Sequence, residues 1–366
     1  MVVVGAGVLG CAAAYWLGKD GLKVSVIEKE GIAAGASGMT AATFPTLAAR
    51  DSNPDTVQTA NYADAAFALF YEVSSQLSEE SGIDVGFCDD PWLWLALTGA
   101  EADLLMSSSE GVWLDGNEAR EFEPLLAEDV VGARKGWLLQ VLGYPFCLAL
   151  ISVAEKHGVT IRAGEVVSLE RKGGRVAGVR LRGGEFLPAG SVVLAMGPWT
   201  AQLESLIGIV PTVYPVRGQL LILQEAERRL STSISAGGGQ EAYLVRKADG
   251  TLLAGTTKEH DAGFDVSTTS EGQDQILAGA VRLVPSLADA KVVGHVAGLR
   301  PGSRDGEPLV GEVPEWSGLF LLTGHYDNGV GPSLLHAKIT RDLIAGRQAP
   351  AYATPWSPAR LIDASQ

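Results

Sequence analysis

Three glycines near the start of the chain, Gly5, Gly7 and Gly10, follow an apolar strand and open an apolar helix, and Glu28 ends the next apolar strand. In this pattern Gly5 permits a tight turn, Gly7 lets the backbone approach a pyrophosphate, and Gly10 lets the helix pack closely on the sheet. The helix N-terminus offers N–H groups and partial positive charge to phosphates. Glu28 can accept hydrogen bonds from ribose hydroxyls and would repel the 2′-phosphate of NADP. The pattern predicts a dinucleotide site, for FAD or NAD.

The segments that follow must position this site. Ala33–Thr40 is rich in small residues and is expected to be a loop at the carboxyl edge of the sheet, where ligands bind in open α/β folds. Apolar spacing predicts a helix within Thr56–Gly82 and a strand at Pro91–Thr98. Trp92 and Trp94 fall on one face of that strand, where they either wall a substrate pocket or pack in an ordinary core.

From Val159 onward, short strands separated by Gly-Gly turns predict a small meander that returns the chain to the parallel sheet. The later elements expected are a strand at Tyr214–Leu223, a hairpin at Glu241–Thr257 turning at Asp249-Gly250, a helix at Glu271–Val284, strands at Lys291–Leu299 and Leu319–Thr323, and a helix at Ser333–Ala345. This order indicates that the chain crosses between two domains more than once.

One uncharged segment, Trp137–Ala154, approaches the length of a membrane span. Gln140, Gly143 and Pro145 interrupt it, and a helix at Pro145–His157 that stops at Gly158 explains the pattern better. We therefore expect no integral membrane segment.

Composition limits the classes of function. A chain of 366 residues, 46% of them hydrophobic, is long enough for two or three domains with ample core. The formal net charge of −15 argues against a nucleic-acid partner, because phosphates would be repelled. Cys11, Cys88 and Cys147 form no C-x-x-C pair, so we expect neither a metal site nor a disulfide scaffold, and we expect a cytoplasmic location. The first strand follows Met1 directly, so no signal peptide is expected and the true start is expected to lie upstream.

Five segments in order carry a resemblance to a known family: GASGM (35–39), VVLAMGPWT (192–200), PVRGQL (215–220), GLRPGSRDGEPLVG (298–311) and GLFLLTGHYDNGVG (318–331). With the N-terminal motif, they resemble the FAD-dependent D-amino-acid oxidase superfamily, and most closely its glycine oxidase branch, which serves thiamine biosynthesis. The resemblance covers nearly the whole chain and is weakest between about residues 40 and 135. It implies that the cofactor is FAD rather than NAD.

The resemblance also implies a fold: a Rossmann-type α/β domain that binds FAD, and a second α+β substrate domain built on an antiparallel sheet. The segments expected for the FAD-binding domain are 1–80, 146–213 and 297–366, and those for the substrate domain are 81–145 and 214–296.

The family pattern implies where FAD is held. Gly324, Gly329 and Gly331 match a loop whose backbone lies against the flavin, where a Cβ would collide with the ring, and a helix from Ser333 would point N–H groups at it. Val166 matches a residue whose backbone meets the adenine. The full set of expected cofactor-binding residues is Gly5, Gly7, Val8, Gly10, Glu28, Lys29, Ser37, Gly38, Met39, Val166, Ala195, Gly197, Arg300, Gly324, Asn328, Gly329, Val330 and Gly331.

Two expected catalytic residues, Arg300 and Tyr243, match family residues that hold the substrate carboxylate. A guanidinium suits this role because its planar fork makes two parallel charged hydrogen bonds to a carboxylate. For Arg300 the alternative is a structural salt bridge with Asp305 or Glu307, and for Tyr243 it is ordinary packing.

Two positions depart from the glycine oxidase pattern. Asp327 stands where glycine oxidase has an arginine, and Lys258 stands near an apolar pocket position. We expect Asp327 to pair with Arg300 or Lys258, either as a surface or supporting residue or as a change toward a substrate with extra positive charge. His325 and His260 are expected to be structural rather than catalytic bases.

The reaction implied is the oxidation of glycine, or of a small D- or N-substituted amino acid, by hydride transfer from Cα to flavin N5. The resulting imine is hydrolysed to a 2-oxo acid and ammonia. Oxygen or another electron acceptor then reoxidises the flavin, so an oxidase and a dehydrogenase both remain open, as does a homo-oligomeric state. A non-catalytic FAD-binding module is a third alternative.

Overall fold

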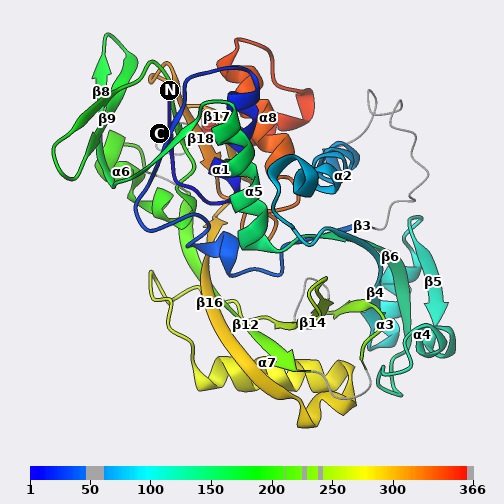
Figure 1. Cartoon of the computed structure of the whole chain (residues 1–366). Coiled ribbons are helices and arrows are strands. Elements are labelled where there is room, and N and C mark those ends of the chain that lie inside the picture. Colours follow the sequence, from blue (N-terminus) through cyan, green and yellow to red (C-terminus); the bar gives the residue numbers. More distant parts are fainter. Residues whose placement is uncertain (47–61, 211, 225–228, 238–241, 361–366) are drawn as a thin grey trace.

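Two large sheets, placed one above the other in Figure 1, organise the computed structural model, which describes residues 1–46, 62–210, 212–224, 229–237 and 242–360. The upper sheet is built on parallel strands and the lower one is mainly antiparallel. Strands of the two sheets alternate along the chain, as the sequence predicts. The fold class, a Rossmann-type α/β unit joined to an α+β unit, is confirmed.

The parallel sheet has six strands with β1 near its middle. Their order is β17 (Leu309–Glu312), β18 (Leu319–Thr323), β11 (Val192–Leu194), β1 (Val2–Val4), β2 (Ser25–Glu28) and β7 (Thr160–Ala163). All neighbours are parallel except β17 and β18. The strands are short runs of buried Val, Ile and Leu, which is typical of a sheet covered on both faces.

Alternate residues of these strands face two different layers. Val3, Val193 and Phe320 belong to the core formed with the helices α1 (Val8–Lys19), α2 (Tyr62–Ser81), α5 (Gly143–Lys156) and α8 (Ser333–Ile344). Their neighbours Val2, Val192 and Leu319 face a second core. That core is completed by a three-stranded sheet, β8 (Val166–Lys172), β9 (Arg175–Leu181) and β10 (Phe186–Pro188), and by α6 (Leu203–Ile207).

The antiparallel sheet has nine strands and includes the long pair β12 (Val213–Gln224) and β16 (Lys291–Ser303), which runs up toward the parallel sheet (Figure 1). The order continues through β15 (Leu252–Gly255), β14 (Ala242–Arg246), β13 (Ser233–Ala236), β4 (Cys88–Ala96), β6 (Gly132–Gln140) and β3 (Thr43–Thr46), with β5 (Val112–Asp115) also paired to β6. One neighbouring pair, β13 and β4, is parallel.

The two faces of this sheet differ. One face packs on α7 (Ser270–Leu283) and α4 (Gly116–Phe122) through residues such as Leu93, Leu221 and Leu244. The other carries Trp92, Leu138, Leu220, Val245 and Leu253 and faces away from α7. The remaining helix, α3 (Gly99–Met106), covers the edge near β4 and β6.

The main elements expected from the sequence are present with small shifts at their ends. The helix expected within Thr56–Gly82 is α2; positions 56–61 of that prediction lie outside the described residues. The hairpin at Glu241–Thr257 is β14 and β15, turning at Asp249-Gly250 as predicted. Three helices, α3, α4 and the short α6, were not predicted.

The five-segment domain division stays a prediction. Within the segment 1–80, β3 pairs with β6 of the antiparallel sheet, and β16 extends past residue 296 to Ser303.

The uncharged segment Trp137–Ala154 divides between the end of β6 and α5. α5 begins two residues before Pro145, and it ends at Lys156 before Gly158, whose φ is +85°. Within the described ranges, no helix is both long and apolar enough to cross a membrane.

Candidate functional site

The N-terminal glycines have the geometry that the motif predicts. Gly5 has φ +102°, and a Cβ there would lie 2.4 Å from the Ala195 carbonyl oxygen. A Cβ on Gly10 would lie 2.0 Å from the Gly5 carbonyl oxygen, so only glycine lets α1 pack this closely on β1. Gly7 precedes α1 without a side-chain cap, and the nearest atom to a Cβ there is Ser37 Oγ at 3.3 Å. Gly7, Val8 and Leu9 line a cavity at this end of α1, where helix N–H groups can meet an anionic ligand.

Glu28 ends β2 beside these glycines. Its Oε2 accepts a hydrogen bond from the Ala6 N–H at 2.7 Å, and its Oε1 accepts one from the Glu30 N–H at 2.9 Å. The Lys29 ammonium lies 4.2 Å from the ring centroid of Trp199. Both carboxylate oxygens of Glu28 are thus oriented by backbone, and each keeps a further lone pair for a hydroxyl donor.

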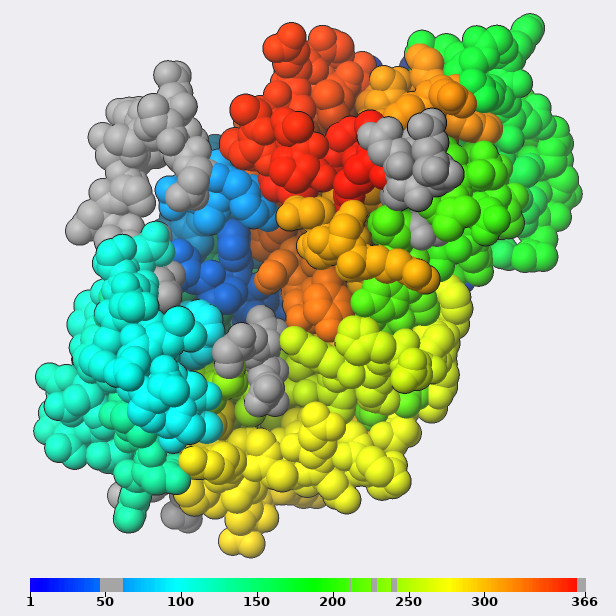
Figure 2. Space-filling view, turned by 180° about the vertical axis from the view of Figure 1, so that it is seen from behind, coloured from blue at the N-terminus to red at the C-terminus, as the bar shows by residue number. Residues whose placement is uncertain are grey.

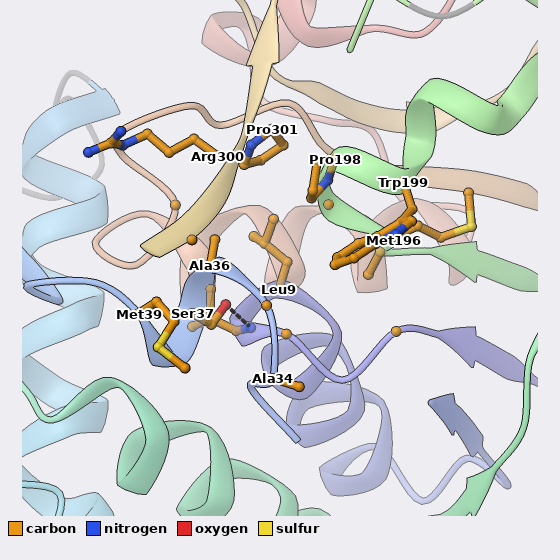
Figure 3. Close-up of a pocket in the computed structure, with 18 of the residues that line it drawn as sticks. Leu9, Ala34, Ala36, Ser37, Met39, Met196, Pro198, Trp199, Arg300 and Pro301 are labelled. Atoms are coloured by element: carbon orange, nitrogen blue, oxygen red, sulfur yellow. Dashed lines mark hydrogen bonds between the residues drawn. The ribbon is translucent and has the colours of Figure 1, made fainter. Parts of the chain in front are cut away.

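The small-residue loop closes over the start of α1. Its short 3-10 helix, Ala36–Gly38, places Ser37 so that Oγ accepts the Val8 N–H at 2.9 Å, the dashed contact in Figure 3. Gly38 lies against the Ala33 carbonyl, where a Cβ would approach to 2.5 Å, and Met39 packs over Gly298 of β16. The loop therefore joins the N-terminal motif to the strand that carries Arg300.

One cavity connects these parts, with about 1490 Å³ of space counted to its open mouth. It reaches from the glycine turn to the antiparallel sheet, and Figure 3 shows residues of α1, the small-residue loop, the β11 end and β16 around it. The expected cofactor-binding residues that line it are Gly5, Gly7, Val8, Glu28, Lys29, Ser37, Met39, Val166, Ala195, Gly197, Arg300, Gly329 and Val330. Gly10 and Gly38 do not line the cavity, but they pack against the backbone of Gly5 and Ala33 next to it.

The three glycines of the C-terminal loop have different surroundings. Gly324, Gly329 and Gly331 were all expected to lie against the flavin ring, but only Gly329 lines the cavity. Gly324 has φ +80° and lies against Pro308 and Leu309, and a Cβ on Gly331 would lie 2.5 Å from the Phe44 ring. Gly324 is therefore required by its turn and Gly331 by protein packing, whereas Asn328 borders a second cavity.

Arg300 lies on β16, half-enclosed, with its side chain 18% exposed. Its Nη1 donates to the Thr257 carbonyl at 3.0 Å, Nη2 to Thr256 Oγ1 at 2.7 Å, and Nε lies 2.8 Å from Asp327 Oδ1. A guanidinium has five N–H groups, so these three contacts leave one on each terminal nitrogen for a bound anion. The side chain lies flat on β12, because a Cβ on Gly218 would lie 1.9 Å from Nη1.

Asp327 is the salt-bridge partner of Arg300, rather than Asp305 or Glu307. Its Oδ2 also lies 3.3 Å from Lys258 Nζ, and its side chain is 13% exposed. Asp305 instead pairs with Arg360. Asp327 was expected to pair with Arg300 or Lys258, and it contacts both. Its low exposure excludes a surface position and agrees with a supporting role beside Arg300. The three groups together carry one net positive charge.

Tyr243 is on β14, and its side chain lies near that of Arg300 on β16. A Cβ on Gly255 would lie 2.1 Å from the Tyr243 ring, so the ring rests on the backbone of β15. The pKa of the phenol is raised, chiefly by burial, which keeps the hydroxyl protonated as a hydrogen-bond donor. Tyr243 and Arg300 therefore lie together on a floor made by two glycines of neighbouring strands.

A second cavity, with about 900 Å³ of space, adjoins the first. The two share Thr40, Tyr243, Arg300 and Asp327. Trp92 and Trp94 lie on one face of β4, as predicted, with ring centroids 5.7 Å apart, and both line this second cavity. The two interpretations of the tryptophans are therefore compatible, because the rings pack in the sheet face and also form a cavity wall.

The histidines are placed as structural groups. His325 is buried at the edge of the main cavity, and its Nε2 lies 2.6 Å from Nδ1 of the buried His336. Burial lowers the pKa of His325 to about 3 and that of His336 well below its usual value, so both imidazoles are neutral. His260 stacks near Tyr214 and Tyr326 and lines neither cavity.

The described residues contain neither clustered metal ligands nor a disulfide. No group of three or more His, Cys, Asp or Glu side chains among the described residues is arranged to hold a metal ion. Cys11, Cys88 and Cys147 are unpaired thiols.

The profile of the DAO family, described as FAD dependent oxidoreductase, matches residues 1–343. This chain belongs to the DAO family. FAD is its cofactor, and this DAO-family chain is an FAD-dependent oxidoreductase. The cavity fits that cofactor, because the N-terminus of α1, which the Gly7 side of the turn leaves without a cap, and the oriented Glu28 carboxylate line the same space.

Similar DAO-family proteins cover nearly the whole chain. Glycine oxidase of Geobacillus kaustophilus is 32% identical over 99% of this chain and 97% of that protein. Glycine oxidase of Pseudomonas aeruginosa is 30% identical, with 98% of each chain covered. The crystal structure of the Geobacillus kaustophilus enzyme superposes with a TM-score of 0.86 at 31% identity, covering 98% of both chains.

Several residues of the site were not found from the sequence. Thr256 and Thr257 hold the Arg300 guanidinium from a loop with no motif of its own, and Trp199 covers the cavity beside Lys29. The GPW sequence after β11 was a usable signal for Trp199, because it lies in one of the segments that carry the family resemblance and a large aromatic ring contributes much contact area where it packs.

Proposed function

We propose that this protein catalyses the oxidative deamination of glycine or of a small D- or N-substituted amino acid. The observation that carries the proposal is the set of contacts made by Arg300, which lines the cofactor cavity. Each terminal nitrogen donates one hydrogen bond to the protein and keeps a second N–H, and Nε lies beside Asp327. A planar fork with two such donors suits a carboxylate. The relatives named glycine oxidase support the same substrate class.

The side chains around Arg300 position the substrate rather than transfer protons. Thr256, Thr257 and Asp327 fix the guanidinium, so little conformational freedom is lost when a carboxylate binds. Tyr243 supplies a further donor beside it. When bound, FAD supplies the acceptor for the hydride that leaves Cα.

No dedicated base is required for this reaction. The substrate amine must be neutral, and its lone pair assists as the Cα–H bond breaks to give an imine. Water hydrolyses the imine to a 2-oxo acid and ammonia, or the corresponding amine when the nitrogen carries a substituent. His325 and His336 are neutral and bonded to each other, which keeps added positive charge away from the amine. The apolar face of the antiparallel sheet, with Leu220 and Val245, limits water around the reacting carbon.

Anaerobic mixing of the flavin-loaded protein with glycine, sarcosine, D-alanine and D-proline tests the proposal. At least one of them is expected to bleach the flavin absorbance. Glycine or D-alanine would release ammonia in equal amount, sarcosine would release methylamine, and D-proline would give a cyclic imine that keeps its nitrogen. Readmission of oxygen, with peroxide measured, then separates an oxidase from an enzyme that uses another acceptor. A flavin that stays oxidised with every amino acid would contradict the proposal and favour a non-catalytic FAD-binding role.

A further inference from the structure

The second cavity begins where the carboxylate site ends. Arg300 and Tyr243 border both cavities, so a ligand held by Arg300 has space on the side away from the dinucleotide motif. Glycine would leave this space empty. Because the α-carbon of glycine carries only hydrogen, that substrate has no group to contact the residues that line this space, Trp92, Trp94 and Leu138 among them.

The wall of this cavity is mainly apolar and aromatic. Trp92 and Trp94 stand side by side on β4 with their rings inclined by 35°, and Leu138 and Val245 extend the surface from the neighbouring strands. Trp94 is only partly buried, so part of its ring is available to a ligand. Such a surface gains free energy by covering an apolar or aromatic group.

The charges around the cavity argue against an anionic group there. Asp327 lies at the junction of the two cavities, and Arg300 is the only cationic side chain among the described residues that line the second one. The net positive charge of Arg300, Lys258 and Asp327 is balanced by one substrate carboxylate. A second carboxylate would approach Asp327 without a further cation to offset the repulsion.

We infer that the second cavity binds the substituent of a larger monocarboxylic amino acid, an apolar or aromatic group carried on nitrogen or on Cα, and that Asp327 excludes substrates with a second carboxylate there. This inference rests on the proposed function. It names Trp92, Trp94 and Asp327 as specificity-determining residues of the same site.

A matched series of substrates tests the inference by the rate of anaerobic flavin reduction. N-isobutylglycine and iminodiacetate have substituents of nearly the same shape but different charge, so the first is expected to react at least tenfold faster at equal low concentration. N-benzylglycine and D-phenylalanine place an aromatic group on nitrogen or on Cα, and at least one is expected to exceed glycine in kcat/KM by tenfold or more.

Variants connect these preferences to the named residues. Asp327→Asn is expected to reduce the preference for N-isobutylglycine over iminodiacetate at least tenfold. Trp94→Ala is expected to reduce the ratio of kcat/KM for N-benzylglycine or D-phenylalanine to kcat/KM for glycine. Asp305→Asn is the matched control, because Asp305 pairs with Arg360 and lines neither cavity, and it is expected to leave both ratios unchanged.

The outcomes separate the two proposals. If glycine reduces the flavin but no larger substrate does so faster, or if iminodiacetate matches N-isobutylglycine, the second cavity is not this subsite and the proposed function stands. If no amino acid in either series reduces the flavin, both proposals fail.

Discussion

The two ends of the main cavity are built by different means. At the dinucleotide end, the surface is made by backbone: the turn at Gly5, the start of α1 beside Gly7, and a Glu28 side chain that backbone N–H groups orient. At the substrate end, the surface is made by charged side chains from β16 and two separate loops, which meet only in the folded chain. Figure 2 shows the orange C-terminal segments reaching the centre of the molecule, against the yellow-green segments of the antiparallel sheet.

Because of this difference, the two ends tolerate different substitutions. Backbone donors carry no titratable charge and depend on the absence of a Cβ, so the dinucleotide end is sensitive to volume. The substrate end depends on the balance of Arg300, Lys258 and Asp327, so it is sensitive to charge. The predictions below test these two sensitivities.

The largest effect is expected at Gly10. Gly10→Ala places a Cβ 2.0 Å from the Gly5 carbonyl oxygen, which forces α1 away from β1 and distorts the phosphate-binding turn. Bound flavin per protein, measured by absorbance, is expected to fall at least tenfold. Gly99→Ala is the matched control, because nothing lies within 4 Å of a Cβ at that position. Full flavin content in Gly10→Ala would show that α1 can move without loss of the site.

Arg300→Leu tests the charge sensitivity of the substrate end. Loss of the charged hydrogen bonds to a carboxylate is expected to cost about 2–5 kcal/mol, or roughly 30- to 5000-fold in kcat/KM, with flavin still bound. Steady-state kinetics and flavin absorbance measure the two quantities on one sample. Arg282→Leu removes a solvent-exposed pair with Asp129 and is expected to change neither. Loss of flavin together with activity in Arg300→Leu would show that the two ends are not separable.

A smaller effect is expected from pH, through Lys247. Its ammonium is buried beside the second cavity and donates to the Ala41 and Val141 carbonyls, and burial lowers its pKa to about 7 from the usual 10.5. Between these values the unfolded chain binds a proton that the folded chain does not. The free energy of unfolding therefore rises with pH across that window, by at most about 1.4 kcal/mol per pH unit from this group, and the gain is lost as pH falls toward 7.

Denaturant unfolding of the FAD-saturated protein at several pH values between 7 and 10 measures this slope. Lys247→Met is expected to remove the contribution, whereas Lys172→Met, at an exposed position of β8, is expected to keep it. An unchanged slope in Lys247→Met would assign the pH dependence to other groups.

The sequence alone predicted the dinucleotide end almost completely, because its signals are local. The strand, turn, helix and acid of Met1–Glu28 lie within one continuous stretch, and each glycine has a separate steric reason that a motif records. The predicted helix α8 and strand β18 were found for the same reason, since their apolar patterns are uninterrupted. The helices α3 and α4 were missed although capping boxes at Thr98–Glu101 and Asp115–Glu118 mark their starts.

The substrate end was predicted only in part. Charge alone suggested that Asp327 pairs with Arg300 or Lys258. The sequence could not show whether Arg300 pairs with Asp327, Asp305 or Glu307, because separation along the chain does not tell which carboxylate lies nearest in the fold. The roles of Thr256 and Thr257 could not be predicted, because a loop carbonyl and a hydroxyl become ligands of a guanidinium only when β12, β15 and β16 pair in register. Gly331 was assigned to the cofactor through the family resemblance, and its steric partner Phe44 could not be foreseen because it is distant in the chain.

Gly218 and Gly255 have a practical consequence for redesign of this enzyme. Arg300 and Tyr243 rest directly on the main chain at these two positions, so any larger residue there displaces a ligand-holding group instead of reshaping the site gradually. Mutant libraries that aim at new substrates should therefore keep both glycines constant and vary the wall of the second cavity, where Trp92, Trp94 and Leu138 can change without displacing Arg300 or Tyr243 from the main chain beneath them.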